Sequence, residues 1–157
     1  MLQTPDASAL HKVAVIDDEP DVRASYADIL KDLDLGLEPV DVQGPLDTLD
    51  LFVEESLRRS DAAICDYRMK VSNYAGFDGA QLVSEFYKKS FPALLCTRFE
   101  EGIDEIRPYR KHIPILLHWE DLMDPDTLRF SFERLVAELR GEIPPQPALM
   151  ANTRPRS

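Results

Sequence analysis

The sequence predicts a doubly wound α/β fold built on a five-stranded parallel sheet. Short apolar runs of strand length alternate with amphipathic segments of helical period, five times along the 157-residue chain. Apart from the run over 37–43, the strand runs contain continuous apolar stretches, as strands covered on both faces require. Because strand–helix–strand crossovers are right-handed, five such units build one parallel sheet with helices on both faces.

The elements in the first half of the chain follow from apolar spacing and from residues that start or interrupt an element. VAVI (13–16) is a short continuous run, as expected of a buried strand. The segment 20–34 has apolar residues at helical spacing, and Pro20 suits its first position. LEPVDVQ (37–43) predicts an edge strand, because its proline would interrupt a central ladder. An apolar stripe predicts an amphipathic helix over 46–59.

The second half of the chain repeats the pattern. The expected strands are AAICDY (62–67), ALLCT (93–97) and IPILLHW (113–119), and the expected helices cover 78–89, 100–110 and 124–141. Asp78 is a favoured N-cap for the first of these helices. The second is short and weakened by Gly102. The third has the clearest bounds, since Asp124 caps it, Pro125 starts it and Gly141 ends it.

The natural strand order for five such units is the flavodoxin-like order 2-1-3-4-5. In that order the ends of strands one, three and four lie side by side where the connections diverge, which is where open parallel sheets bind ligands. We expect the domain to cover residues 11–141. An N-terminal extension (1–10) precedes it, and a Pro-rich flexible tail or linker start (142–157) follows it.

Composition narrows the class of protein. A formal net charge of −11 argues against direct nucleic-acid binding, which needs a basic face, and is compatible with cationic partners or with solubility alone. No apolar run approaches membrane-spanning length and no signal-peptide pattern opens the chain, so we expect a cytoplasmic protein without membrane association. Cys65 and Cys96 lie in apolar strand runs, and buried apolar thiols are expected in preference to a redox pair.

Oxygen-bearing side chains stand at the ends of three strands. Asp17 and Asp18 follow the first strand, Asp66 ends the third, and Thr97 ends the fourth. Gathered at one edge, three carboxylates and a hydroxyl would form a hard oxygen site suited to Mg²⁺ and a phosphoryl group. Helix capping is the plainer role for each Asp. One cap does not need two acids, however, and a lone carboxylate ending an apolar strand is costly unless solvated, paired or metal-bound.

The segments VAVIDDEPDVRASYADIL, AAICDYRM and ALLCT together resemble the receiver domain of two-component response regulators, over nearly all of the chain. By this resemblance Asp66 is the phosphoacceptor. Asp17, Asp18 and Asp66 would bind Mg²⁺ together with the backbone carbonyl of Arg68, and Thr97 would move toward the phosphoryl group. The chemistry is suitable, because a metal neutralises charge on the transferring group while a carboxylate attacks in line.

The resemblance also implies partners. A histidine kinase, a phosphotransfer protein or a small phosphodonor would supply the phosphate. A downstream protein would bind the face formed by the fourth helix, the fifth strand and the last helix, and a homodimer through the last helix is compatible with the sequence but not required by it. The domain would not be an enzyme for a separate substrate, since its chemistry would be its own phosphorylation and dephosphorylation. The sequence identifies neither the kinase nor the output partner.

Several features depart from the usual receiver pattern. Receivers end the fifth strand with a lysine followed by a proline, whereas this chain has His118 and Trp119 there. A protonated imidazole could only partly replace the lysine ammonium. Arg98 follows Thr97 where a small residue is usual, so its guanidinium could supply the missing cation or block entry. The loop RMKVSNYAGF after the third strand is longer than usual, and its Tyr74 could cover the pocket.

We therefore predict an atypical receiver that binds Mg²⁺ and accepts phosphate at Asp66. Two alternatives stay open. A pseudo-receiver would act purely as a protein-interaction module, through a face that includes Tyr109, Arg110, Trp119 and Phe130. A Mg²⁺-dependent phosphatase similar to the haloacid dehalogenase type would use Asp17 or Asp18 as nucleophile, but the threonine that such enzymes place after their second acid is missing here.

Overall fold

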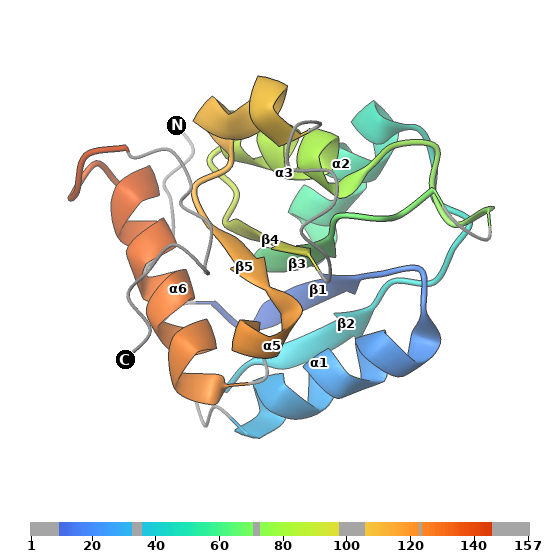
Figure 1. Cartoon of the computed structure of the whole chain (residues 1–157), viewed down its shortest axis with the longest axis horizontal. Helices are drawn as coiled ribbons and strands as arrows, with labels where there is room; N and C mark the ends of the chain where they lie inside the picture. The colour runs from blue at the N-terminus through green and yellow to red at the C-terminus, as the bar shows by residue number, and fades with distance from the viewer. Residues whose placement is uncertain (1–9, 33–35, 71–72, 98–105, 123, 146–157) are drawn as a thin grey trace.

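The five strands form one parallel sheet in the order β2-β1-β3-β4-β5, as the sequence predicts (Figure 1). The structure is a computed structural model that describes residues 10–32, 36–70, 73–97, 106–122 and 124–145. Its strands are β1 (Lys12–Ile16), β2 (Glu38–Asp41), β3 (Ala62–Asp66), β4 (Ala93–Thr97) and β5 (Leu116–His118). Its helices are α1 (Pro20–Asp32), α2 (Leu49–Arg59), α3 (Gly79–Lys88), the 3-10 helix η3 (Arg107–His112), α5 (Trp119–Leu122) and α6 (Pro125–Leu139).

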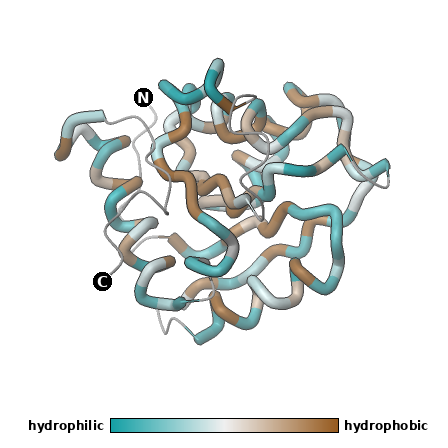
Figure 2. The backbone as a smooth tube through the Cα atoms, in the orientation of Figure 1, coloured by the Kyte–Doolittle hydropathy of each residue, from teal (hydrophilic) through white to brown (hydrophobic). Residues whose placement is uncertain are grey.

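Helices cover both faces of the sheet, and each face has its own apolar core. On one face α2 and α3 pack over side chains such as Ala63 and Leu95. On the other, α1 and α6 pack over Ile64 and Leu94. Every residue of β3 and β4 is buried, and the hydrophobic positions concentrate in the strands at the middle of the view (Figure 2). The sheet is therefore a rigid frame whose carboxyl edge positions the loops.

The two cysteines divide between these cores. Cys65 on β3 and Cys96 on β4 lie on adjacent strands but belong to opposite faces of the sheet. Both are buried and free, and burial raises the pKa of the Cys65 thiol. The prediction of buried apolar thiols is confirmed, because successive residues of a strand point to opposite faces and hold the two sulfurs apart.

The helix caps predicted for α3 and α6 are confirmed. Asp78 caps α3, since its side chain accepts the backbone N–H of Gln81 at 2.9 Å while the Gln81 side chain accepts the backbone N–H of Asp78 at 3.0 Å. Asp124 caps α6 through the N–H of Asp126. Gly141, at φ 76°, follows the end of α6 in the left-handed region that glycine favours.

Two elements near the end of the sheet differ from the prediction. Most of the expected helix over 100–110 lies outside the described residues, and residues from Arg107 onward form η3 instead of an α-helix. The expected strand over 113–119 is shorter, because β5 begins only at Leu116 and Trp119 already starts α5. Pro114 lacks the backbone N–H that a strand ladder needs. Among the described helices, none has the length and apolar character needed to cross a bilayer.

Candidate functional site

Three predicted carboxylates come together at the carboxyl edge of the sheet. Asp17, Asp18 and Asp66 each offer one oxygen, and these oxygens lie within 4.8 Å of one another. The register explains the meeting, because Ile16 of β1 pairs with Cys65 of β3 and the next residue of each strand is an aspartate. Parallel strands therefore deliver both side chains to the same edge, as the strand order predicts.

The cluster has the properties of a cation site. Asp17 is fully buried and Asp66 is 4% exposed, while Asp18 is half-buried. Carboxylates at such short separations, two of them buried, repel one another unless a cation or a proton compensates their charge. Ligand oxygens on opposite sides of Mg²⁺ are separated by about 4.2 Å, so this set can surround Mg²⁺ after a small side-chain movement or with one ligand acting through water. The donor set fits a hard divalent cation.

Local backbone hydrogen bonds orient two of the carboxylates. The N–H of Glu19 donates to Oδ1 of Asp17 at 2.8 Å. The N–H of Arg68 donates to Oδ2 of Asp66 at 3.0 Å, while the Arg68 side chain is exposed. Each bond joins a residue to the one two positions earlier, which is the local turn that aspartate favours after a strand. Both carboxylates are thus held by the first residues of the loops that follow them.

Thr97 and His118 end the two strands on the other side of Asp66. Asp66 pairs with Cys96, and Thr97 pairs with His118, so the three side chains occupy successive strand ends. Thr97 is 4% exposed. His118 is half-buried, and its Nδ1 accepts the backbone N–H of Glu120 at 3.3 Å. Arg98 lies outside the described residues.

Sequence reasoning missed Arg23, which is one of the best-anchored side chains near the cluster. It lies on the buried stripe of α1, three residues before Tyr26, and is 7% exposed. Its Nη1 donates to the backbone carbonyl of Asp17 at 2.7 Å, and its Nε donates to Oδ1 of Asp41 at 2.6 Å. The helical spacing of α1 could have revealed Arg23, because it places the arginine on the same stripe as buried apolar residues. An arginine in that position needs polar partners inside the fold.

Tyr26 places a polar group in the core on the α1 face of the sheet. Its hydroxyl lies 3.1 Å from Sγ of Cys96 in the core between α1 and the sheet. Burial raises the pKa of Tyr26 most strongly, and Cys96, Asp66 and Asp17 raise it further. The phenol is therefore held neutral and adds no negative charge near the acid cluster.

The long loop after β3 folds back onto the molecule. Phe77, like Tyr74, is 4% exposed and packs in the core on the α2 and α3 face. The N–H of Ala75 donates to the carbonyl of Met69, and the N–H of Leu46 donates to the carbonyl of Tyr74. Tyr74 and the exposed Asn73 line one wall of an open cleft beside Asp18. The loop therefore borders the acid cluster through Tyr74 and Asn73, while Phe77 is part of the core.

Gly79 allows α3 to begin directly against the phosphoacceptor candidate. A Cβ at this position would overlap the backbone carbonyl oxygen of Asp66 and would lie 2.8 Å from its carbonyl carbon. The N–H of Gly79 also donates to the carbonyl of Tyr67 at 2.9 Å. Only a residue without a side chain permits this approach, so the position of Asp66 depends on Gly79.

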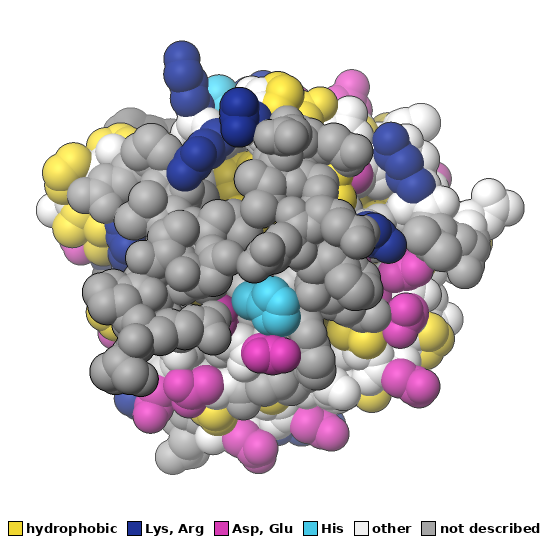
Figure 3. Space-filling model, viewed as in Figure 1, with side chains coloured by type: hydrophobic (Ala, Val, Ile, Leu, Met, Phe, Trp, Pro, Cys, Tyr) yellow, Lys and Arg dark blue, Asp and Glu magenta, His cyan; other side chains and the backbone are white. Residues whose placement is uncertain are grey.

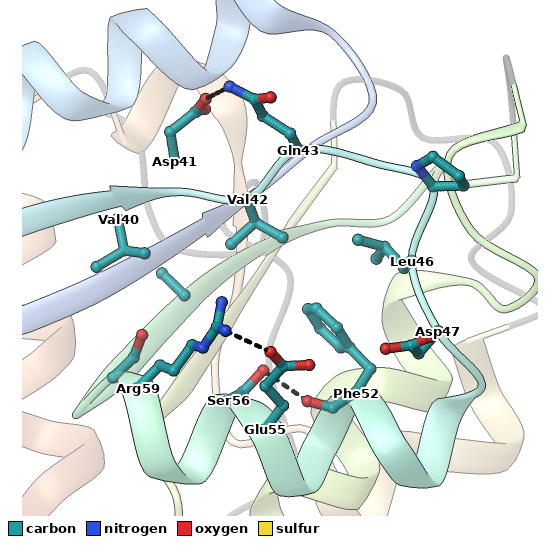
Figure 4. Close-up of a pocket in the computed structure, with 13 residues that line it drawn as sticks. Val40, Asp41, Val42, Gln43, Leu46, Asp47, Phe52, Glu55, Ser56 and Arg59 are labelled. Atoms are coloured by element: carbon teal, nitrogen blue, oxygen red, sulfur yellow. Dashed lines mark hydrogen bonds and ion pairs between the residues drawn. The ribbon is translucent and has the colours of Figure 1, made fainter.

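A second hollow, between β2 and α2, lacks the features of a reactive site (Figure 4). It has a volume of about 180 Å³, with Val40, Val42, Leu46 and Phe52 among its lining residues. The polar side chains drawn there bond to neighbours in the same wall: Gln43 to Asp41 at 3.2 Å, Arg59 to Glu55 at 2.9 Å, and Ser56 to the Phe52 carbonyl at 2.8 Å. The acid cluster is the stronger candidate.

Solved structures share this fold. A response regulator receiver domain protein from Clostridium thermocellum matches with a TM-score of 0.62 at 16% identity, covering 85% of this chain and 100% of that chain. The chemotaxis protein CheY4 of Vibrio cholerae matches at 0.54 and 22% identity, covering 81% and 99%. A LuxR-family two-component response regulator from Aurantimonas sp. SI85-9A1 matches at 0.62 and 14% identity, covering 92% of each.

The sequence comparisons add no family assignment. No protein-family model and no curated protein matches the sequence. At the identities of the structural matches, the similarity concerns the fold. The chain therefore has the fold of response-regulator receiver domains, as the sequence resemblance implied.

Proposed function

We propose that the chain is an atypical receiver domain that accepts a phosphoryl group on Asp66 in phosphorelay signalling, with Mg²⁺ held by Asp17, Asp18 and Asp66. The observation that carries the proposal is the cluster of three carboxylate oxygens within 4.8 Å at the carboxyl edge of the sheet. Ligands of open α/β sheets bind at this edge, where the strand order reverses. The receiver fold of the chain supports the same role.

The chemistry follows from the roles of four side chains and of the Arg68 backbone. An oxygen of the Asp66 carboxylate forms a bond to phosphorus while the bond from phosphorus to the donor's leaving group breaks; with acetyl phosphate, acetate leaves. The hydrogen bond from the Arg68 N–H holds that carboxylate at the end of β3. Bound Mg²⁺ would supply charge neutralisation for the phosphoryl oxygens, with Asp17, Asp18 and the Arg68 carbonyl among its ligands. The Thr97 hydroxyl can donate to a phosphoryl oxygen.

His118 makes the proposed receiver atypical. With Nδ1 bonded to the N–H of Glu120, its imidazole has only Nε2 left to contact a phosphoryl group, whereas a lysine ammonium offers three donors and a full charge. We therefore expect the phosphorylated state to be held less firmly than in a receiver with a lysine at this strand end.

The partners are part of the proposal. A histidine kinase or a phosphotransfer protein would donate the phosphate, and the only chemistry would be phosphorylation and dephosphorylation of Asp66 itself. A downstream protein would bind the face of η3, β5 and α6. Basic side chains gather over η3 at the top of Figure 3, although the chain as a whole is acidic. Phe130 on α6 is 66% exposed and offers an apolar contact.

Intact-mass spectrometry after incubation with acetyl phosphate and Mg²⁺ tests the proposal. We expect one phosphoryl adduct on the wild type, none on Asp66→Asn, and an unchanged adduct on Asp28→Asn, which neutralises an exposed carboxylate of α1. His118→Lys should retain more phosphate over time, because an ammonium would pair with the phosphoryl group. Labelling that survives Asp66→Asn would disprove the assignment.

A pseudo-receiver that acts only as an interaction module is the second candidate. His118 favours it, since the lysine that is usual at the end of β5 is replaced by a group that is already hydrogen-bonded to Glu120. If neither the wild type nor His118→Lys gains a phosphoryl adduct, this function becomes the better one. A partner would then bind equally well with and without a phosphodonor.

A further inference from the structure

We infer that Arg23 and Tyr74 form a clamp that holds the Asp17–Asp18 turn in its metal-binding arrangement before the metal arrives. They are positioning residues, because they act through the backbone of Asp17. The inference deepens the proposed function and rests on it for the metal, but the rigidity of the turn can be tested without any metal.

Arg23 fastens the ends of two neighbouring strands. One branch of its guanidinium group holds the carbonyl of Asp17, directly after β1, and its Nε holds Asp41, the last residue of β2. A planar fork of fixed donors suits such a bridge, and lysine cannot reproduce both bonds in that geometry. The Asp41 side chain is 53% exposed, so the ion pair alone adds little to stability. The two Arg23 bonds instead fix the ends of β1 and β2 relative to each other.

Tyr74 completes the clamp from the long loop after β3. The Arg23 guanidinium lies 5.7 Å from the centre of the Tyr74 ring, within cation–π range. The Tyr74 hydroxyl donates to the carbonyl of Val42 at 2.6 Å. Burial raises the pKa of Tyr74, while Arg23 and a backbone hydrogen bond from Asp17 oppose that rise. The same side chain therefore contacts the end of β1, the segment after β2 and the arginine between them.

Asp17 is consequently restrained at both its backbone and its side chain. Arg23 holds its carbonyl oxygen, and the N–H of Glu19 holds its Oδ1. Without a cation, the mutual repulsion of three nearby carboxylates would tend to open the turn. The clamp opposes that opening with a fixed positive charge and with bonds to two neighbouring segments. A site that is already in place loses less entropy when it binds its ion.

Matched variants can distinguish a role in holding the Asp17–Asp18 turn from a general contribution to the stability of the fold. Arg23→Lys and Tyr74→Phe remove its key bonds, and each has a matched control. Arg59→Lys changes an arginine that pairs with Glu55 on α2, and Tyr87→Phe removes a tyrosine hydroxyl that bonds to Glu138. A purely structural role would lower Tm without changing the behaviour of the Asp17–Asp18 turn.

Two measurements on the full chain decide the question. Isothermal titration calorimetry with MgCl₂ should show a Kd raised about tenfold in Arg23→Lys and several-fold in Tyr74→Phe, as is typical when a group that orients a metal ligand is removed. Without Mg²⁺, NMR hydrogen exchange should show the Glu19 amide exchanging about tenfold faster in both variants, because its partner Asp17 is less restrained. Both controls should match the wild type in both measurements.

Unchanged Mg²⁺ affinity and unchanged Glu19 exchange in both clamp variants would overturn the inference, whatever happens to Tm. If the wild type binds no Mg²⁺, the proposed function fails, and the exchange measurement still decides whether the clamp exists. If Arg23→Lys does not fold, Tyr74→Phe decides alone, because it keeps the ring and its packing. In that case, exchange of the Glu19 amide in Tyr74→Phe that is as slow as in the wild type would refute the clamp.

Discussion

Gly79→Ala is the sharpest test of how the fold holds Asp66. The added Cβ would overlap the carbonyl oxygen of Asp66 and would also lie 2.9 Å from Cδ1 of Leu95. The obstacle is mainly backbone, which cannot rotate away as a side chain can. The start of α3 and the end of β3 would have to separate by roughly 1.5 Å to restore an ordinary C···O contact.

The cost can be bounded from the contacts involved. Overpacking at a tight interior position costs about 1–3 kcal/mol. Separation also weakens the bond from the Gly79 N–H to the Tyr67 carbonyl, which adds about 1 kcal/mol. The better helix propensity of alanine offsets up to about 1 kcal/mol. We therefore expect a net loss of about 2 kcal/mol, which lowers Tm by about 6–10 °C for a domain of this size.

Thermal unfolding followed by circular dichroism measures this loss, and Gly76→Ala is the matched control. Nothing lies within 4 Å of a Cβ built at Gly76, in the same loop, so that variant should unfold like the wild type. Phosphorylation by acetyl phosphate should also slow in Gly79→Ala, because the displaced carbonyl belongs to Asp66, the proposed phosphoacceptor. Wild-type Tm and labelling rate in Gly79→Ala would show that α3 does not position Asp66 in this way.

Two further predictions concern a helix cap and a buried phenol. Asp78→Ala removes the side-chain bond of the α3 capping box and leaves the bond from its backbone N–H to Gln81, so it should lower the free energy of unfolding by about 1 kcal/mol in urea titrations. Tyr26 stays protonated in the folded protein, whereas the unfolded chain loses that proton near the ordinary pKa of 10.0. Its contribution is complete below that pH and is lost above it, so the wild type should lose stability in alkali faster than Tyr26→Phe, by up to about 1.4 kcal/mol per pH unit.

The Asp78 and Tyr26 predictions can each be contradicted by a specific result. Thr48 is the N-cap of α2 but makes no side-chain capping bond, so Thr48→Ala should change the unfolding free energy far less than Asp78→Ala does. Equal losses of unfolding free energy in the two variants would show that the capping bond of the Asp78 side chain does not stabilise α3. If the wild type and Tyr26→Phe have parallel profiles of stability against pH above about pH 10, then Tyr26 ionises equally readily in the folded and the unfolded chain.

Most of the fold could be predicted because its elements carry local signals. Continuous apolar runs indicated the strands, and Asp78, Asp124 and Gly141 marked helix ends that the structure confirms. The prediction was weakest near β5, where Pro114 interrupts an apolar run and shortens the strand. An apolar run shows that a segment is buried, but it does not show where hydrogen-bonded pairing begins.

The acid cluster could be predicted as well, since it needs only strand ends and a strand order. Asp17 and Asp66 meet because each directly follows a residue of a paired register. The surroundings of the cluster could not be predicted in the same way. His118 stands at the expected strand end, but its hydrogen bond to Glu120 exists only because α5 starts at the next residue.

The sequence by itself determined the alternation of strands and helices, the sheet order and the edge at which the carboxylates gather. Those features depend on the period of apolar residues within each element and on the handedness of crossovers, which are properties of local chain geometry. Only the tertiary structure decided what holds the cluster. The Arg23 bond to Asp41 spans 18 residues and the Tyr74 bond to Val42 spans 32. Partners at such separations are chosen by how loops pack against one another, and no periodicity within a single element records that choice.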